Sequence, residues 1–354
     1  MRQLIFTAEA WLAQGERVAV ATVVRVIGTA PQPAGARMIA STAGRMAGSV
    51  SGGCVEAAVY AEAQAVLAGG APRLLRFGIT EEMIWDVGLA CGGTIDVLVQ
   101  ELDPALAGAL VREMGAERAT ALAAVVAGPG GAGETLLLGS GELLAGPADP
   151  AVLQALRRQL DRRTPRGTIE TLEDGREIFL QVFLPRPALY ILGGVHVAIP
   201  LTRLARELGF RVVVADPRAK FANADRFPDA DEVLVEWPDE ALAHLPVGRD
   251  TYIVLLTHDP KIDEPALAAA LRTDAAYLGA IGSRKTHAGR AARMAKWGIT
   301  ADQLAQVHAP IGLDLGGRTP EETALSIIAE ILAVKNGRTG GPLRDSSGPI
   351  VGAG

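Results

Sequence analysis

The stretch LYILGGVHVA at residues 189–198, followed by RVVVAD at residues 211–216, decides the fold of the second half of this chain. Leu189–Leu192 is a short apolar run that ends in two glycines. A helix is expected from His196 to Leu208, where Gly209 stops it. Residues 211–216 then predict a second strand that ends in an acid. This order of strand, glycine turn, helix and strand indicates a parallel, doubly wound sheet.

Further strands at residues 232–235, 252–256 and 277–281 extend this sheet. The last helix is expected to begin at Thr319, because the sequence TPEE at 319–322 supplies a capping box with proline in the first turn. It runs to about Lys335. We therefore predict a Rossmann-like domain over residues 188–336 and a disordered tail, rich in glycine, serine and proline, over residues 337–354.

The first half has a different pattern. Residues 18–27 and 94–99 predict strands, and residues 57–67 predict a helix. Two hairpins are expected, one joining 120–127 to 134–138 and one joining 168–172 to 177–183. Pro185 and Pro187 interrupt regular structure between the halves. We predict an α+β domain over residues 1–184, so the fold class is α/β, with an N-terminal α+β domain followed by a Rossmann-like parallel sheet.

Composition narrows the class of protein. The 354 residues are 49 % hydrophobic and 21 % charged, as in ordinary globular chains. The net charge of −6 and the 4 % aromatic content argue against a nucleic-acid binder, and we expect no membrane segment. Two cysteines are too few for a disulfide framework and fit a reducing compartment. We expect a cytoplasmic protein.

The glycine turn is a candidate nucleotide site. Gly193 and Gly194 lie where a dinucleotide-binding fingerprint belongs, and Asp216, 23 residues after Gly193, is placed to bind a ribose. Val195 occupies the position of the second glycine of that fingerprint and would crowd a pyrophosphate. NAD(P) or another nucleotide and a plain structural turn therefore both stay open. His196 fits equally well as a ligand-binding residue and as a packing or capping residue.

Polar residues also follow two later strands of the predicted sheet. His258 comes after one strand, and Ser283, Arg284 and Lys285 follow the next. The carboxyl ends of parallel strands are where ligands bind in such sheets. A helix N-terminus with adjacent positive charge suits an anion.

Two glycine-rich segments carry the two cysteines: GSVSGGCVE at 48–56 and GLACGG at 88–93. We expect Cys54 in the first turn of the following helix, where the helix N-terminus favours the thiolate, the nucleophilic and metal-binding form. The surrounding amides could hold an oxyanion. The alternative is that Cys54 and Cys91 are small buried hydrophobic residues, the commonest role of a free cysteine.

Both glycine–cysteine segments, together with ILGGVHVA at 191–198, LTHDPKID at 256–263, YLGAIGSRKTH at 277–287 and APIGLDLGGRTPEETALSIIAEI at 309–331, resemble the xanthine dehydrogenase accessory factor family of the XdhC/CoxI type. The resemblance implies a non-catalytic accessory protein, with no catalytic residues of its own, that binds molybdenum cofactor (molybdopterin). It implies sulfuration of that cofactor with a cysteine desulfurase and its insertion into a molybdenum hydroxylase. We also expect a homodimer.

The resemblance places Cys54 next to molybdenum, and Arg37 or Arg284 on the cofactor phosphate. The full set of expected cofactor-binding residues is Arg37, Ser51, Gly52, Gly53, Cys54, Cys91, Gly92, Gly93, Gly193, Gly194, His196, Asp216, His258, Ser283, Arg284 and Lys285. Two other classes of protein stay open. One is an NAD(P)-dependent oxidoreductase that uses the Rossmann-like domain, and the other is a scaffold that joins desulfurase and target without holding a small molecule.

Overall fold

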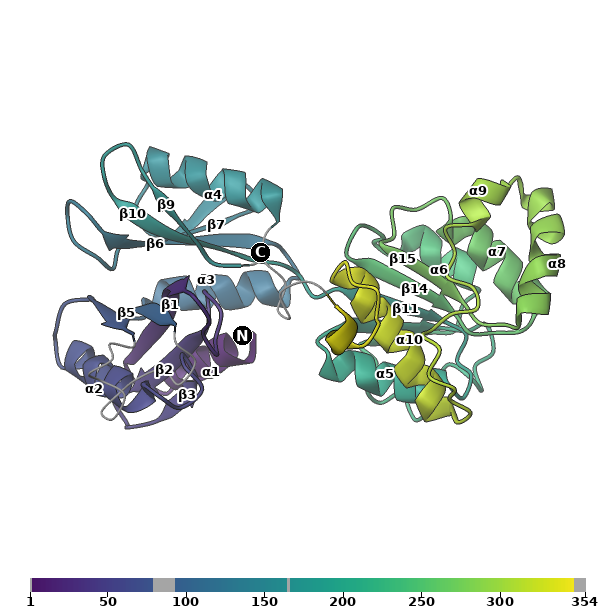
Figure 1. Cartoon of the computed structure of the whole chain (residues 1–354), viewed down its shortest axis with the longest axis horizontal. Helices are drawn as coiled ribbons and strands as arrows, with labels where there is room; N and C mark the ends of the chain where they lie inside the picture. Colours follow the sequence, from purple (N-terminus) through teal and green to yellow (C-terminus); the bar gives the residue numbers. More distant parts are fainter. Residues whose placement is uncertain (1, 79–92, 164–165, 347–354) are drawn as a thin grey trace. The chain divides into compact units, whose positions relative to one another are not determined.

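The computed structural model describes residues 2–78, 93–163 and 166–346 of the chain (Figure 1). The chain forms two compact units, residues 1–185 and residues 186–354. Among the described residues, the first unit contains two antiparallel five-stranded sheets and the second contains one parallel five-stranded sheet.

The first half of the N-terminal unit is a helix, three strands, a helix and two strands. These elements are α1 (Arg2–Ala13), β1 (Val18–Ile27), β2 (Arg37–Ser41), β3 (Met46–Gly48), α2 (Glu56–Leu67), β4 (Arg73–Phe77) and β5 (Thr94–Glu101). The strands form one sheet in the order β3-β2-β1-β5-β4. The predicted strand over residues 18–27 is β1, the long central strand of this sheet.

The second half of the unit repeats this architecture. Its elements are α3 (Pro104–Gly115), β6 (Thr120–Ala127), β7 (Thr135–Gly139), β8 (Glu142–Ala145), α4 (Pro150–Arg162), β9 (Thr168–Thr171) and β10 (Glu177–Phe183). Their order along the chain is the same, and the sheet order β8-β7-β6-β10-β9 is equivalent strand for strand. The N-terminal unit is therefore a tandem structural repeat, with β1, β2 and α2 equivalent to β6, β7 and α4.

Successive side chains of a strand point to opposite faces of its sheet, so each strand of the N-terminal unit contributes to two different packed layers. Ala19, Ala21 and Val23 of β1 pack under α2, whereas Val24 faces the second sheet and contacts the cluster around Phe179. The outer face of the second sheet is covered by α4. Helix α1 contacts β1 and β2 of the first sheet, and α3 contacts β7 and β8 of the second. The two helices also contact each other (Figure 1).

The C-terminal unit is a doubly wound sheet, which confirms the predicted fold class. Its sheet runs β13-β12-β11-β14-β15, and every pairing is parallel. The elements are β11 (Ala188–Leu192), α5 (Ala198–Glu207), β12 (Arg211–Ala215), β13 (Glu232–Leu234), α6 (Pro238–His244), β14 (Thr251–Leu255), α7 (Pro260–Ala270), β15 (Tyr277–Ala280), α8 (Arg284–Met294), α9 (Ala301–Leu304) and α10 (Pro320–Lys335).

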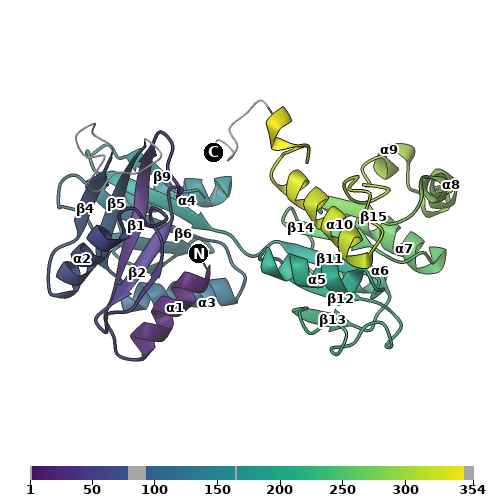
Figure 2. The same ribbon diagram turned by 60° about the horizontal axis from the view of Figure 1, so that its bottom comes forward.

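Helices cover both faces of this parallel sheet. Helices α5 and α10 pack side by side on one face, and α6 and α7 pack on the other (Figure 2). Thr319 caps α10 with the predicted capping box. Of the tail predicted to be disordered, residues 337–346 are described and include the 3-10 turn Leu343–Asp345; the remainder lies outside the described residues. No helix in the described part of the chain is long and apolar enough to cross a membrane.

Candidate functional site

The loop over residues 48–55 brings Cys54 to the surface. Gly53 has φ of +120°, a conformation that L side chains rarely adopt, and a Cβ built on it would meet nothing within 4 Å. Glycine is therefore favoured at residue 53 by its positive φ rather than by a close neighbour, and the space beside its Cα, next to Cys54, is open. Cys54 is a free, exposed thiol, so it is not the small buried hydrophobic residue of the alternative interpretation.

The expected position of Cys54 in the first helical turn is wrong by two residues. The first residue of α2 is Glu56, and Val55 is the residue that precedes the helix. Cys54 lies on the loop before that residue, because the backbone at Gly52 and Gly53 has positive φ and cannot belong to a right-handed helix.

The amides of this loop converge on the carboxylate of Glu56. Glu56 accepts hydrogen bonds from the Ser49 hydroxyl at 2.7 Å and from the Ser51 and Gly53 amides, each at 2.9 Å. Burial alone would raise the pKa of Glu56, but the serine hydroxyls and loop amides outweigh it and lower the pKa to about 2. The oxyanion site expected from the sequence is thus engaged by the chain's own carboxylate.

The second cysteine segment is described only at its end. Cys91 and Gly92 lie outside the described residues. Gly93 is described, and a Cβ there would come within 2.2 Å of the Thr29 carbonyl oxygen. Glycine is required at this position because the two backbone segments approach so closely.

Arg37 does not join Cys54. It begins β2, and its neighbour Met38 packs with Val55 and Val59 on the α2 side of the sheet. Since successive side chains of a strand point to opposite faces, the Arg37 side chain lies on the other face, where it lines an internal cavity.

In the C-terminal unit, the glycine turn and Asp216 are brought together at the carboxyl edge of the sheet. Asp216 is fully buried and accepts a hydrogen bond from the Gly194 amide at 2.9 Å. It also accepts two from the Arg218 guanidinium, at 2.8 and 2.7 Å. Burial would raise the pKa of Asp216, but these donors outweigh it and the pKa is lowered. A ribose would have to compete with Arg218 for this carboxylate.

The backbone at Phe221 lies close to the glycine turn of residues 193–194. A Cβ on Gly194 would lie 2.4 Å from the Phe221 carbonyl oxygen, and Phe221 stacks under the Arg218 guanidinium at 4.0 Å. Val195 is half-buried and packs against the apolar cluster of α5. The space that a dinucleotide fingerprint keeps for pyrophosphate is therefore bordered by the chain's own backbone at Phe221.

The remaining predicted residues lie on the same carboxyl edge. His196 and His258 are exposed. Ser283 caps α8 by accepting a hydrogen bond from the Thr286 amide at 3.1 Å. Arg284 and Lys285 are exposed in the first turn of this helix. This turn combines a helix N-terminus, a neutral cap and two positive charges, which suits an anion.

Sequence reasoning missed a buried polar cluster behind this edge. The Thr257 hydroxyl donates a hydrogen bond to Asp263, and Arg290 forms an ion pair with Asp263 at 3.5 Å. Burial raises the pKa of Asp263 to about 6, although Thr257 and Arg290 oppose the shift. One signal was available: Asp263 lies between the apolar residues Ile262 and Ala266 on the buried side of α7.

Described residues include no group of three or more His, Cys, Asp or Glu side chains arranged to hold a metal ion. The described sites suit recognition of a thiol-reactive group in the N-terminal unit and of an anion in the C-terminal unit.

Comparison with known proteins covers both units. Residues 11–78 match the family model of the XdhC and CoxI family, and residues 189–331 match that of the XdhC Rossmann domain. A Bacillus subtilis protein, named as a probable subunit of xanthine dehydrogenase, is 26 % identical over 334 residues, covering 92 % of this chain and 96 % of the relative. The molybdenum cofactor insertion chaperone PaoD of Escherichia coli is 29 % identical over 336 residues, covering 94 % and 87 %.

A solved structure is similar as well. The crystal structure of a Bacillus halodurans protein, described as a xanthine dehydrogenase, matches with a TM-score of 0.76 and 26 % identity, over 97 % of each chain.

Proposed function

Because the chain belongs to the XdhC and CoxI family, we propose that it is an accessory protein that binds molybdenum cofactor, supports its sulfuration and inserts it into a molybdenum hydroxylase of the xanthine dehydrogenase type. The names of two relatives, one a molybdenum cofactor insertion chaperone and the other a probable part of xanthine dehydrogenase, support this function. The cofactor is the cargo of such a protein rather than its resident group.

One observation carries the proposal: the two repeats of the N-terminal unit begin their outer helices differently. In the second repeat, α4 begins with Asp149 as an ordinary cap and Pro150 in the first turn. In the first repeat, α2 is preceded instead by a glycine loop with the exposed thiol of Cys54. The architecture does not require this loop, which supports a role in binding. Cysteine sulfur is a soft ligand and a suitable neighbour for molybdenum and sulfur.

We propose that the start of α8 is a second site, in the C-terminal unit by itself, that binds an anion such as phosphate. Two other candidate anion sites already hold carboxylates, Glu56 in the cysteine loop and Asp216 at the glycine turn. At α8 the cap is the neutral hydroxyl of Ser283, and Arg284 and Lys285 are exposed. A phosphate there would gain free backbone amides and two cations without displacing a bound anion.

We also propose that the chain forms a homodimer and acts with two protein partners. A cysteine desulfurase would supply sulfur, and a molybdenum hydroxylase would receive the finished cofactor. Light scattering on the purified full chain gives its mass in solution and tests the dimer directly.

Anaerobic titration of the full chain with molybdenum cofactor tests binding. Retained molybdenum and pterin fluorescence are measured after gel filtration. We expect about one equivalent per chain for the wild type. Cys54→Ala should weaken retention of the whole cofactor, molybdenum and pterin together, at least tenfold. Arg284→Gln/Lys285→Gln should weaken binding of inorganic phosphate to the C-terminal unit through the lost charge, measured in a separate titration.

Matched variants serve as controls. Asp149→Ala changes the start of α4, the equivalent helix of the second repeat, and Arg157→Gln/Arg158→Gln removes two exposed cations from α4. Both should bind like the wild type. Equal binding by Cys54→Ala would remove the thiol from the site. Failure of the wild type to retain cofactor, where a cofactor-free hydroxylase retains it, would overturn the function.

A further inference from the structure

Glu56 is the first residue of α2, but its carboxylate serves the loop before the helix. Each of its two oxygens accepts three hydrogen bonds from donors on residues 49–55. Oε1 accepts from the Ser49 hydroxyl at 2.7 Å and from the amides of Val50 and Ser51, at 3.2 and 2.9 Å. Oε2 accepts from the Ser51 hydroxyl and from the amides of Gly53 and Val55, at 2.9 and 3.2 Å. One oxygen therefore holds the first part of the loop, and the other holds the part that contains Cys54.

Cys54 lies between two amides that bond to the same oxygen atom. Its neighbours Gly53 and Val55 both donate to Oε2 of Glu56, so the backbone is fixed on both sides of the cysteine. The Cys54 thiol is exposed. Within the described residues, the Cys54 amide is the one amide of residues 49–55 that donates to no partner. The carboxylate therefore gathers the loop without engaging Cys54 itself.

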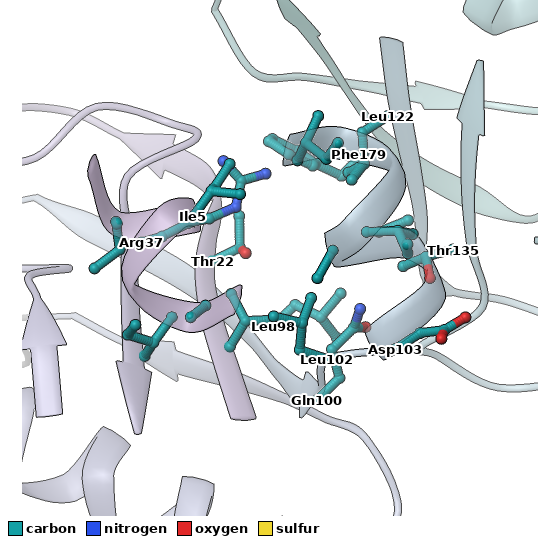
Figure 3. Close-up of a pocket in the computed structure, with 18 of the residues that line it drawn as sticks. Ile5, Thr22, Arg37, Leu98, Gln100, Leu102, Asp103, Leu122, Thr135 and Phe179 are labelled. Carbon is teal, nitrogen blue, oxygen red and sulfur yellow. The ribbon is translucent and has the colours of Figure 1, made fainter. Parts of the chain in front are cut away.

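Packing anchors this loop only at its two ends. At its start, the Ser49 amide donates to the Arg37 carbonyl oxygen at 3.0 Å, while the Arg37 side chain lies in the internal cavity on the other face of the sheet (Figure 3). Val50 and Val55 are buried in the apolar cluster under α2. Residues 52–54 between them are exposed, so hydrogen bonds to the carboxylate, rather than packing, fix their path.

The equivalent helix of the second repeat shows what the start of a helix requires. Asp149 precedes α4 and accepts hydrogen bonds from two amides of that helix, Ala151 at 2.9 Å and Val152 at 3.2 Å. Val55, which precedes α2, makes no side-chain cap. The donors to Glu56 all lie in the loop before α2. Capping of the helix therefore does not explain this arrangement.

We infer that Glu56 is a positioning residue for Cys54: its carboxylate holds residues 49–55 so that the thiol is presented outward in one conformation. This inference rests on the proposed function, in which Cys54 meets the cofactor. A loop that is ordered before binding avoids the loss of conformational entropy that a flexible loop would undergo when the cofactor binds. Glu56 acts through Cys54 and makes no contact with the cofactor itself.

Two substitutions of Glu56 test the carboxylate in different ways. In Glu56→Gln one oxygen is replaced by an NH₂ group, and either orientation of the side chain places that group against two backbone N–H donors. Glu56→Ala removes the carboxylate and the carbon next to it, which together are the heavy atoms of acetate. Acetate can therefore accept the same hydrogen bonds in this variant. Recovery in acetate is a result that a general loss of stability would not give.

Selective ¹³C labelling of cysteine reports on the loop in the full chain. The chain has two cysteines, and the Cys54→Ala variant identifies the NMR signals of Cys54. We expect Glu56→Ala and Glu56→Gln to shift these signals toward those of a cysteine in a flexible peptide. Acetate should return the Glu56→Ala signals to their wild-type positions in a saturable titration. It should not do so for Glu56→Gln, because the glutamine side chain occupies the space. Glu56→Gln serves for the shift if Glu56→Ala does not fold.

Retention of molybdenum cofactor is then measured on the same proteins. We expect Glu56→Ala to retain the cofactor about tenfold more weakly than the wild type, and saturating acetate to restore retention. Glu62→Ala is a control on the same helix, and Asp149→Ala is a control that removes the cap of the equivalent helix. Both should keep the wild-type Cys54 signals and cofactor retention, with and without acetate.

The contrary results separate this inference from the proposed function. Wild-type Cys54 signals in Glu56→Ala would overturn the inference, because packing alone would then position the cysteine. Shifted signals with unchanged cofactor retention would also overturn it, because Glu56 would then be only structural. Shifts that acetate does not reverse would show that the carboxylate is not the group that holds the loop. A wild type that retains no cofactor would overturn the proposed function, whereas the Cys54 signals and their recovery in acetate would still decide whether Glu56 positions Cys54.

Discussion

Replacing Glu56 with glutamine should destabilise the N-terminal unit, because its carboxylate collects the donors of the cysteine loop. The pKa of Glu56 falls from 4.5 to about 2, and one pKa unit corresponds to about 1.4 kcal/mol. The upper bound is therefore about 3 kcal/mol. Glu56 is half-buried, so solvent screens part of this interaction, and we expect roughly 2 kcal/mol at pH 7.

The pH dependence of this effect has a defined sign. The carboxyl has a lower pKa in the folded than in the unfolded protein, so its stabilisation is complete above about pH 4.5 and is lost as the pH falls through about 2. The difference in unfolding free energy between wild type and Glu56→Gln should therefore shrink at pH 3.

Urea unfolding with pulse hydrogen exchange, detected by mass spectrometry on peptides of α2, measures this difference for the N-terminal unit alone. Glu62→Gln is the matched control, because Glu62 lies on the same helix and pairs only with exposed Arg73 in the described structure; its cost should stay within about 0.5 kcal/mol. A Glu56→Gln variant as stable as Glu62→Gln at pH 7 would show that the Glu56 carboxylate does not stabilise the loop.

Three further predictions concern the C-terminal unit. Gly194→Ala should cost about 1–3 kcal/mol, measured by urea unfolding, because the new methyl group would lie 2.4 Å from the Phe221 carbonyl oxygen; an unchanged midpoint would show that Phe221 moves freely. Asp263 has a raised pKa of about 6, so its contribution to stability is complete below about pH 3.8 and falls as the pH rises through 6; Asp263→Asn should remove this part of the pH dependence, and an identical profile would contradict it. Thr319→Ala should lower stability by about 1 kcal/mol through loss of the α10 capping box, whereas Thr319→Ser should retain most of it.

Local patterns predicted much of the fold. The β-branched run over residues 18–27 is β1, and Thr319 begins α10 with its capping box, since both depend on interactions between near neighbours. The tandem repeat was not predicted. The equivalent strands β1 and β6 share a pattern of burial and, with Val18 aligned to Thr120, four of eight residues, but so short a likeness does not by itself indicate a repeat. The pairing of β1 with β5 joins segments far apart in sequence. No local signal encodes such a contact.

The candidate site was also predicted only in part. The glycine–cysteine loop and Asp216 were found because their residue types are unusual at those positions. What these residues contact was not found. Glu56 is inside the quoted motif, yet its side chain folds back onto the loop amides, and Asp216 is engaged by Arg218 two residues away. Both outcomes depend on side-chain conformation, which sequence spacing does not fix.

We propose that the chain holds molybdenum cofactor and passes it on. The most direct measurement loads the full chain with sulfurated cofactor under anaerobic conditions and mixes it with a cofactor-free molybdenum hydroxylase. Molybdenum and pterin are then followed between the two proteins by size-exclusion chromatography, together with the activity of the hydroxylase. We predict transfer of about one equivalent and a matching gain of activity. Cofactor that never associates with the chain, or that reaches the hydroxylase equally well without it, would contradict this function.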